Sequence, residues 1–218
     1  MITASGAEYH LTGIAMLDAK TRPVHIGDIA HHLSQINRFT GACKRPYSVA
    51  EHSLFVSEIA QRNGCGMGAQ LAALLHDAHE AYTTDLSSPA KTAVNHLAGL
   101  SGGTAAWSQF EDIHAKHVRS ALRISTAIAG AKTAVRMFDL QALVTERRDL
   151  TAWRAETHSA WPLFGSYLDQ AVPVEPIDWI DLDTPEREAM TWRDWRQAFQ
   201  DSYDELVFGL RLMTGEAQ

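Results

Sequence analysis

Residues 71–86 read LAALLHDAHEAYTTDL, an apolar run that passes into a segment rich in side chains able to bind a proton or a metal ion. Leucine and alanine are strong helix formers, and this run is far too short to span a membrane. We therefore expect a helix from about Ala69 to Thr84. It would carry His76 and Asp77 among apolar neighbours, an environment that polar groups do not enter without partners.

The segments on either side also have helical periodicity, and none alternates strongly enough to indicate a sheet. Ser48 followed by Glu51 is the pattern of a capping box that opens a helix. Residues 1–24 are expected to be irregular, and residues 163–183 to form a long connection. The sequence thus predicts an all-α protein, with further helices at about 27 or 28–38, 49–62, 105–124, 132–151 and 185–213.

Composition limits the classes of partner. The chain has 218 residues, 45% of them apolar, and its 19 Lys and Arg against 26 Asp and Glu give a net charge of −7. No basic run is present to replace the counterions of a nucleic-acid polymer, so such a partner is not expected. The two cysteines form no disulfide framework, and no signal peptide or membrane-spanning stretch is visible. A cytoplasmic protein with no membrane partner is the expectation.

Three of the expected helices turn metal-binding side chains toward apolar faces. His52 shares a stripe with Val49, Val56 and Ile59, while Asp139 shares one with Val135, Ala142, Leu143 and Glu146. A single inward histidine is more often a hydrogen-bonded core residue, but a buried carboxylate without a partner costs several kcal/mol. Together with His76 and Asp77, these residues form a mixed nitrogen and oxygen set that suits one divalent ion: Co²⁺, Mn²⁺, Fe²⁺, Zn²⁺ or Mg²⁺.

The pattern resembles that of the HD-domain metal-dependent phosphohydrolases, in which a His, a His-Asp pair and a distant Asp occur in this order. It is most similar to the bacterial 5′-deoxynucleotidase branch and its phage relatives. The likeness covers about residues 27–150 and rests on these stretches: INRF at 36–39, SVAEHS at 48–53 and LLHDAHEAYTTDL at 74–86, continued by Pro89 and Lys91.

This resemblance implies an HD-domain helical bundle with its motif core at about residues 27–150. We expect residues 1–218 to form this single domain, with a Trp-rich extension at 151–218 that lies outside the likeness and adds a C-terminal helix. The resemblance also implies roles for individual residues. Those of the metal ligands fall to His52, His76, Asp77 and Asp139. Glu80 matches the catalytic glutamate, Asp85 matches the acid that contacts the sugar and assists catalysis, and Arg38 matches the arginine that holds the phosphate. Phe39, where the branch has Trp, and Lys91 are expected to bind substrate.

The expected reaction is hydrolysis of a deoxynucleoside 5′-monophosphate to deoxynucleoside and phosphate. One alternative is a deoxynucleoside triphosphate triphosphohydrolase, which would need extra cations such as Lys44, Arg45 and Lys91. The other is a non-catalytic helical module that senses a nucleotide, although such a module needs neither Glu80 nor Asp85.

Several other residues are given no catalytic or metal-binding role here. His79 and Thr84 depart from the branch, which tends to have a small residue and Gly at these positions. His114 and His117 are expected on the surface. The five tryptophans from Trp153 to Trp195 are expected to be core and interface anchors, and an exposed part of this set would favour a homodimer.

Overall fold

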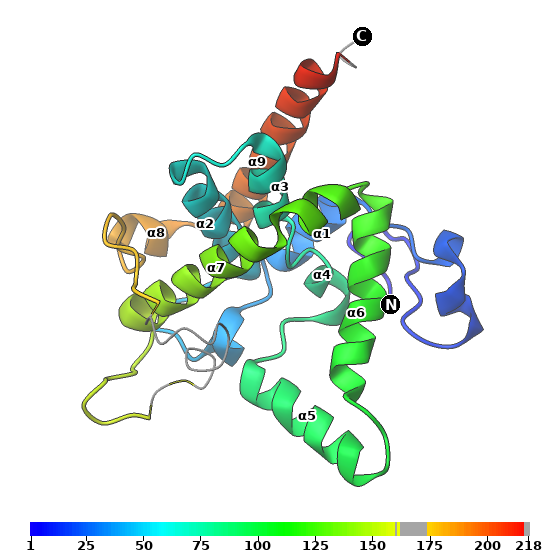
Figure 1. The fold of residues 1–218 in the computed structure, drawn as a ribbon, viewed down its shortest axis with the longest axis horizontal. Helices are drawn as coiled ribbons and strands as arrows, with labels where there is room; N and C mark the ends of the chain where they lie inside the picture. The colour runs from blue at the N-terminus through cyan, green and yellow to red at the C-terminus, as the bar shows by residue number, and fades with distance from the viewer. Residues whose placement is uncertain (160, 162–173, 216–218) are drawn as a thin grey trace.

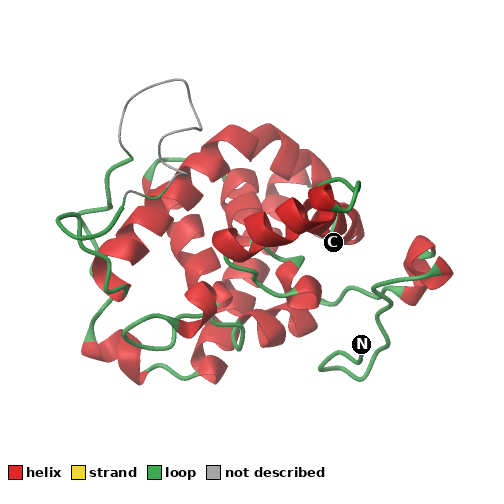
Figure 2. Cartoon of the chain, turned by 90° about the horizontal axis from the view of Figure 1, so that it is seen from below, coloured by secondary structure: helices red, strands yellow, loops and turns green. Residues whose placement is uncertain are grey.

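The computed structural model describes residues 1–159, 161 and 174–215. Every regular element in this part of the chain is helical, and two isolated bridges, Ile2 to Glu8 and Asn37 to Ser48, are its only β pairings (Figure 2). The all-α prediction is therefore confirmed. The elements are η1 (Ile14–Leu17), η2 (Ala19–Thr21), α1 (Ile26–Leu33), η3 (Arg38–Gly41), α2 (Val49–Arg62), α3 (Met67–Leu74), α4 (Glu80–Thr83), α5 (Ser88–Leu100), α6 (Ala106–Ala121), α7 (Ser125–Leu150), α8 (Pro185–Ala189) and α9 (Trp192–Thr214).

The centre of the fold is α3, which packs against α2, α7 and α9 (Figure 1). α2 in turn contacts α7 and α9, so the apolar faces of these helices are buried where they pack together. Leu74 and Leu75 belong to a core that also contains Phe199, while Val56 and Phe138 belong to a second core between α2 and α7. The end of α3 thus lies between α2 and α7, the helices that carry the other expected ligands.

The boundaries of α2 match the prediction residue for residue. Its first turn is capped by Ser48, whose side-chain oxygen accepts a hydrogen bond from the backbone N–H of Glu51 at 3.1 Å. The reciprocal half of the expected capping box is replaced, because the carboxylate of Glu51 binds Arg45 instead. A helix that is defined by local signals of this kind can be located from sequence alone.

The single helix expected over residues 69–84 is wrong, because the backbone turns between α3 and α4. Nδ1 of His76 donates to the carbonyl of Ala73 at 2.7 Å, in competition with the helical bond that this carbonyl would accept. The next backbone bonds span only three residues, such as that from Glu80 to the carbonyl of Asp77 at 2.9 Å. This turn directs His76 and Asp77 out of the apolar packing of α3.

Other expected boundaries also differ. The first helix ends at Leu33 rather than near Arg38, because the backbone at Asn37 is already extended, with φ of −81° and ψ of 134°, and forms a bridge with Ser48. α5 was not expected, although Pro89 in its first turn is a start signal. α7 begins at Ser125, and the expected helix over 185–213 is divided where Thr191 caps α9. The expected connection over 163–183 lies partly outside the described residues, and its described part contains no helix.

The N-terminal segment covers α6, which corrects one prediction. Tyr9 is fully buried, stacks on Tyr82 with ring centroids 4.1 Å apart, and shares a hydrogen bond of 3.1 Å with His114. His114 is consequently buried, not on the surface, and the partly exposed His117 bonds the carbonyl of Arg22. The expected surface position of these histidines was wrong because no local pattern in the sequence indicates that residues 1–24 pack against α6.

The tryptophans only partly form a core. Trp195 is buried in α9 together with Phe199 and Leu206, as expected for a core anchor, whereas Trp179 is exposed. No helix in the described part of the chain combines the length and apolar character that crossing a membrane requires.

Candidate metal centre

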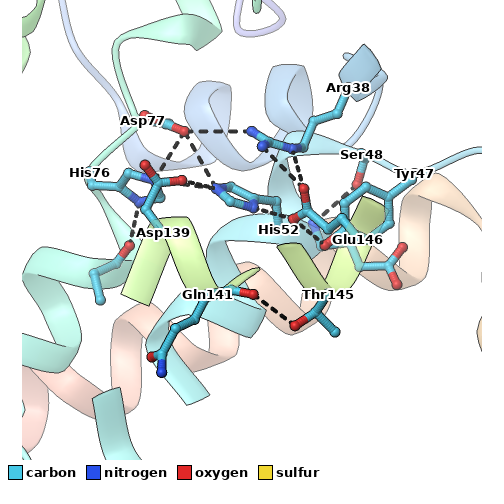
Figure 3. A network of polar contacts seen from close by, with 12 residues as sticks. Arg38, Tyr47, Ser48, His52, His76, Asp77, Asp139, Gln141, Thr145 and Glu146 are labelled. Atoms are coloured by element: carbon cyan, nitrogen blue, oxygen red, sulfur yellow. Dashed lines mark hydrogen bonds and ion pairs between the residues drawn. The ribbon is translucent and has the colours of Figure 1, made fainter. Parts of the chain in front are cut away.

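The four expected ligands converge from three parts of the chain (Figure 3). His52 comes from α2, His76 and Asp77 from the turn after α3, and Asp139 from α7. Nε2 of His52 lies 3.3 Å from Nε2 of His76, 3.4 Å from Oδ1 of Asp139 and 3.7 Å from Oδ2 of Asp77. Nε2 of His76 lies 3.1 Å from that same oxygen of Asp77 and 3.9 Å from Oδ1 of Asp139.

Both imidazoles are oriented through their other nitrogen. Nδ1 of His52 binds Oε1 of Glu146 at 2.5 Å, and Nδ1 of His76 binds the carbonyl of Ala73. Because a carboxylate and a carbonyl are acceptors, each Nδ1 carries a proton and each Nε2 is the nitrogen left to bind a cation. Oδ2 of Asp139 is held in the same manner by Arg136 at 2.8 Å.

The charges of the site favour a cation at its centre. Burial opposes ionisation of Asp139, yet His52 and His76 hold its pKa at about 2, and they hold the pKa of Asp77 well below its usual value. Burial and Arg38 act to lower the pKa of His52, but Glu146 and Asp139 prevail and raise it to about 9. Two carboxylates and two imidazole nitrogens at these separations need a positive charge between them, so the donor set fits a divalent ion.

The two expected catalytic acids lie beside this centre. Glu80 is the first residue of α4 and is buried, with its Oε1 3.9 Å from Nζ of Lys91 and its Oε2 without a hydrogen-bond partner among the described residues. Burial, together with the charges of Asp77 and Asp85, raises the pKa of Glu80 well above its usual value. Burial also raises the pKa of Asp85, against the opposing effect of Arg38.

Arg38 lies within the site, while the other two expected substrate contacts border it. Its guanidinium is 3.9 Å from Oδ2 of Asp77 and 3.2 Å from Oε2 of Glu146. The ring of Phe39 has its centroid 5.5 Å from the guanidinium carbon and 6.0 Å from the ring of Trp161. Lys91 binds Glu111 at 2.6 Å.

His79, Glu80 and Glu111 place three further ligand atoms within 4.8 Å of one another. The ammonium of Lys91 already lies beside both carboxylates of this group, 2.6 Å from Glu111 and 3.9 Å from Glu80. Burial lowers the pKa of His79 to about 4, so its imidazole is neutral at pH 7. This second cluster therefore already contains a cation, the ammonium of Lys91.

Four residues that make hydrogen bonds or ion pairs to the expected site residues were not assigned a role from the sequence: Tyr47, Glu111, Arg136 and Glu146. Glu146 was visible on the apolar face of Asp139, and its burial there was the signal that it contacts something charged. The partners of Tyr47 and Glu111 are 99 and 20 positions away in the chain, so no local pattern could reveal them.

The chain is similar in sequence to a protein family and to individual known proteins. The HD domain model matches residues 49–125, which include the turn with His76 and Asp77. The uncharacterized protein YfdR of Escherichia coli K12 is 31% identical over 155 residues, which cover 69% of this chain and 75% of YfdR. An uncharacterized protein of Rhodobacter capsulatus is 43% identical over 83 residues, which cover 36% of this chain and only 42% of that relative.

The fold and the site thus define a helical protein with a candidate metal centre of His, His-Asp and Asp side chains. The chain belongs to the HD domain family, whose members are generally metal-dependent phosphohydrolases.

Proposed function

We propose that this protein hydrolyses deoxynucleoside 5′-monophosphates to deoxynucleoside and inorganic phosphate. The observation that carries the proposal is the position of Arg38, whose guanidinium lies 3.9 Å from the ligand Asp77 and so borders the metal centre. A planar guanidinium suits the oxygens of a phosphate. A metal centre, a phosphate-binding cation and two acids, the buried Glu80 and the half-buried Asp85, are the parts that phosphomonoester hydrolysis needs.

His52, His76, Asp77 and Asp139 would hold the ion. When bound, a divalent ion supplies Lewis-acid polarisation of a phosphoryl group and lowers the pKa of water. The chain itself supplies the binding of the substrate phosphate by Arg38 and the movement of protons by Glu80 and Asp85.

In the proposed reaction the oxygen of water bonds to phosphorus as the bond from phosphorus to the 5′-oxygen breaks. Glu80 accepts the proton that the water loses, and burial together with the charges of Asp77 and Asp85 raises its pKa and so makes it a stronger base than an exposed carboxylate. Asp85, whose pKa burial also raises, donates a proton to the leaving 5′-oxygen. Phe39 closes the site on the side of the sugar.

The alternative substrate, a deoxynucleoside triphosphate, is less well supported. The three cations expected to bind the outer phosphates are already paired: Lys44 with Asp183 at 2.8 Å, Lys91 with Glu111 at 2.6 Å and Arg45 with Glu51 at 2.7 Å. Arg45 is also buried and donates to the carbonyl of Leu182. A triphosphate would have to break these pairs before it could be bound.

Separation of the products by ion chromatography tests the proposal. With Mn²⁺ or Co²⁺ present, we expect dAMP to yield phosphate and deoxyadenosine, and dATP to yield little triphosphate. Faster release of triphosphate from dATP than of phosphate from dAMP would establish the alternative. Absence of turnover on both, with bound metal, would favour the nucleotide-sensing module.

A further inference from the structure

Glu146 is a fully buried carboxylate that contacts two parts of the site at once (Figure 3). Its Oε1 accepts hydrogen bonds from Nδ1 of His52 at 2.5 Å and from the hydroxyl of Tyr47 at 2.9 Å. Its Oε2 accepts from Nη2 and Nε of Arg38 at 3.2 and 3.3 Å. Oε1 therefore contacts an expected metal ligand, and Oε2 contacts the cation that is expected to bind phosphate.

The charge of Glu146 is maintained despite its burial. Two hydrogen bonds from the guanidinium of Arg38, with one each from His52 and Tyr47, compensate the burial of this carboxylate. Orienting an imidazole does not by itself require a charged partner, because the carbonyl of Ala73 does this for His76. A carboxylate differs from a carbonyl in that it also makes the imidazole a more basic ligand.

The position of Glu146 in the sequence couples these contacts to the metal centre. It lies on α7 two turns beyond Asp139, so the same helical face provides one expected ligand and the group that orients another. Because its second oxygen holds Arg38, the orientation of the phosphate-binding cation depends on the same side chain. Tyr47 occupies the remaining direction and restricts the carboxylate to this geometry.

We propose that Glu146 is a positioning residue that sets the orientation and basicity of His52 toward the ion and fixes Arg38 toward the substrate phosphate. This inference rests on the proposed function for the roles of the ion and the phosphate. Glu146 itself touches neither of them.

The test compares Glu146→Gln with Glu51→Gln and the unaltered protein. Glu51 is a matched control, because it is another fully buried glutamate with arginine partners, Arg45 and Arg187. Although it precedes His52 in the chain, its side chain makes no hydrogen bond or ion pair with an expected ligand among the described residues. The Kd for Co²⁺ is measured by competition with a chelator, and the visible absorption of bound Co²⁺ reports the ligand geometry. Glu146→Asp is included because it keeps the charge beside Arg38 but shortens the reach to His52.

We expect Glu146→Gln and Glu146→Asp to weaken Co²⁺ binding by roughly 10- to 100-fold and to alter the Co²⁺ spectrum. Glu51→Gln should leave both unchanged. At saturating Co²⁺, the Glu146→Gln protein should show a raised KM for dAMP, because Arg38 has lost its anchor. If Glu146→Gln does not fold, Glu146→Asp is judged by the same two metal readouts.

Co²⁺ affinity within twofold of the unaltered protein, with an unchanged spectrum, would overturn the inference. So would an equal loss in Glu51→Gln, which would show a general effect of removing a buried charge. Both metal readouts are independent of turnover, so a wrong substrate leaves them intact. Failure of the unaltered protein to bind Co²⁺ would instead contradict the proposed function.

Discussion

Nε2 of His52 and Nε2 of His76 face each other at 3.3 Å, although 24 positions separate the two residues in the chain. Each ring donates its Nδ1 proton elsewhere, to Glu146 and to the carbonyl of Ala73. Two facing nitrogen lone pairs repel one another unless a proton or a metal ion lies between them. The folded chain therefore maintains a site for positive charge that the unfolded chain does not have.

Divalent ions should consequently stabilise the protein against heat. At a hundredfold excess over Kd, an ion that binds only the folded state adds about 2.7 kcal/mol, which for a chain of this size raises Tm by roughly 5 to 10 °C. Differential scanning fluorimetry of chelator-stripped protein with added Co²⁺ or Mn²⁺ measures this shift. The same titration on His52→Ala is the control and should show no shift, while an unresponsive Tm in the unaltered protein would argue against the site.

Metal affinity should depend on pH in a direction that the metal-free site determines. Glu146 and Asp139 raise the pKa of His52 to about 9 against the effects of burial and Arg38, so at neutral pH an entering ion must displace a proton. We expect the apparent Co²⁺ affinity to increase as pH rises toward 9. A Co²⁺ affinity that falls over this range would show that His52 is not the residue that competes.

The stability of the metal-free protein should change in the opposite sense. Because the pKa of His52 is raised on folding, the stabilisation it provides is complete below pH 6.5 and is lost as pH rises toward about 9. Tm measured in chelator should therefore fall between pH 6.5 and 9. His52→Gln, which has no titratable group at this position, should flatten the decline.

Helices defined by local signals were predictable, and those shaped by distant contacts were not. α2 was predicted at its exact bounds because Ser48 caps it and an apolar stripe runs through it. The break between α3 and α4 could not be predicted, because it depends on a bond from the His76 side chain to a backbone carbonyl. The candidate site followed the same rule. The periodicity indicated that the expected ligands lie on apolar helix faces, but the contact between Glu146 and His52 could not be predicted, because it joins residues 94 positions apart.

Asp77 and Glu80 lie three residues apart and should respond differently to substitution. Asp77 is an expected ligand, so Asp77→Ala should lose both bound metal and activity. Glu80 is expected to move a proton, so Glu80→Gln should keep the metal and lose roughly 10²- to 10⁴-fold in turnover. Metal content per chain, measured alongside turnover on dAMP, separates the two roles. A Glu80→Gln protein that is stripped of metal would place Glu80 among the ligands.

The sugar should be discriminated at its 2′ position. We expect Phe39 and Asp85 to close the site around the sugar, so an added hydroxyl would be crowded and dAMP should be hydrolysed faster than AMP. The measurement is kcat/KM on both nucleotides, with Phe39→Ala as the variant that should narrow the difference. Equal rates on dAMP and AMP would contradict the expected preference for deoxynucleotides, but they would not bear on the candidate metal centre.

The most direct test is a titration of chelator-stripped protein with Co²⁺ while phosphate release from dAMP is recorded. We expect activity to be absent without the ion, to rise in proportion to added Co²⁺ and to level off at one ion per chain. Phosphate release that is independent of Co²⁺, or no release after one ion per chain has bound, would contradict the proposal that this protein is a metal-dependent deoxynucleotide phosphohydrolase.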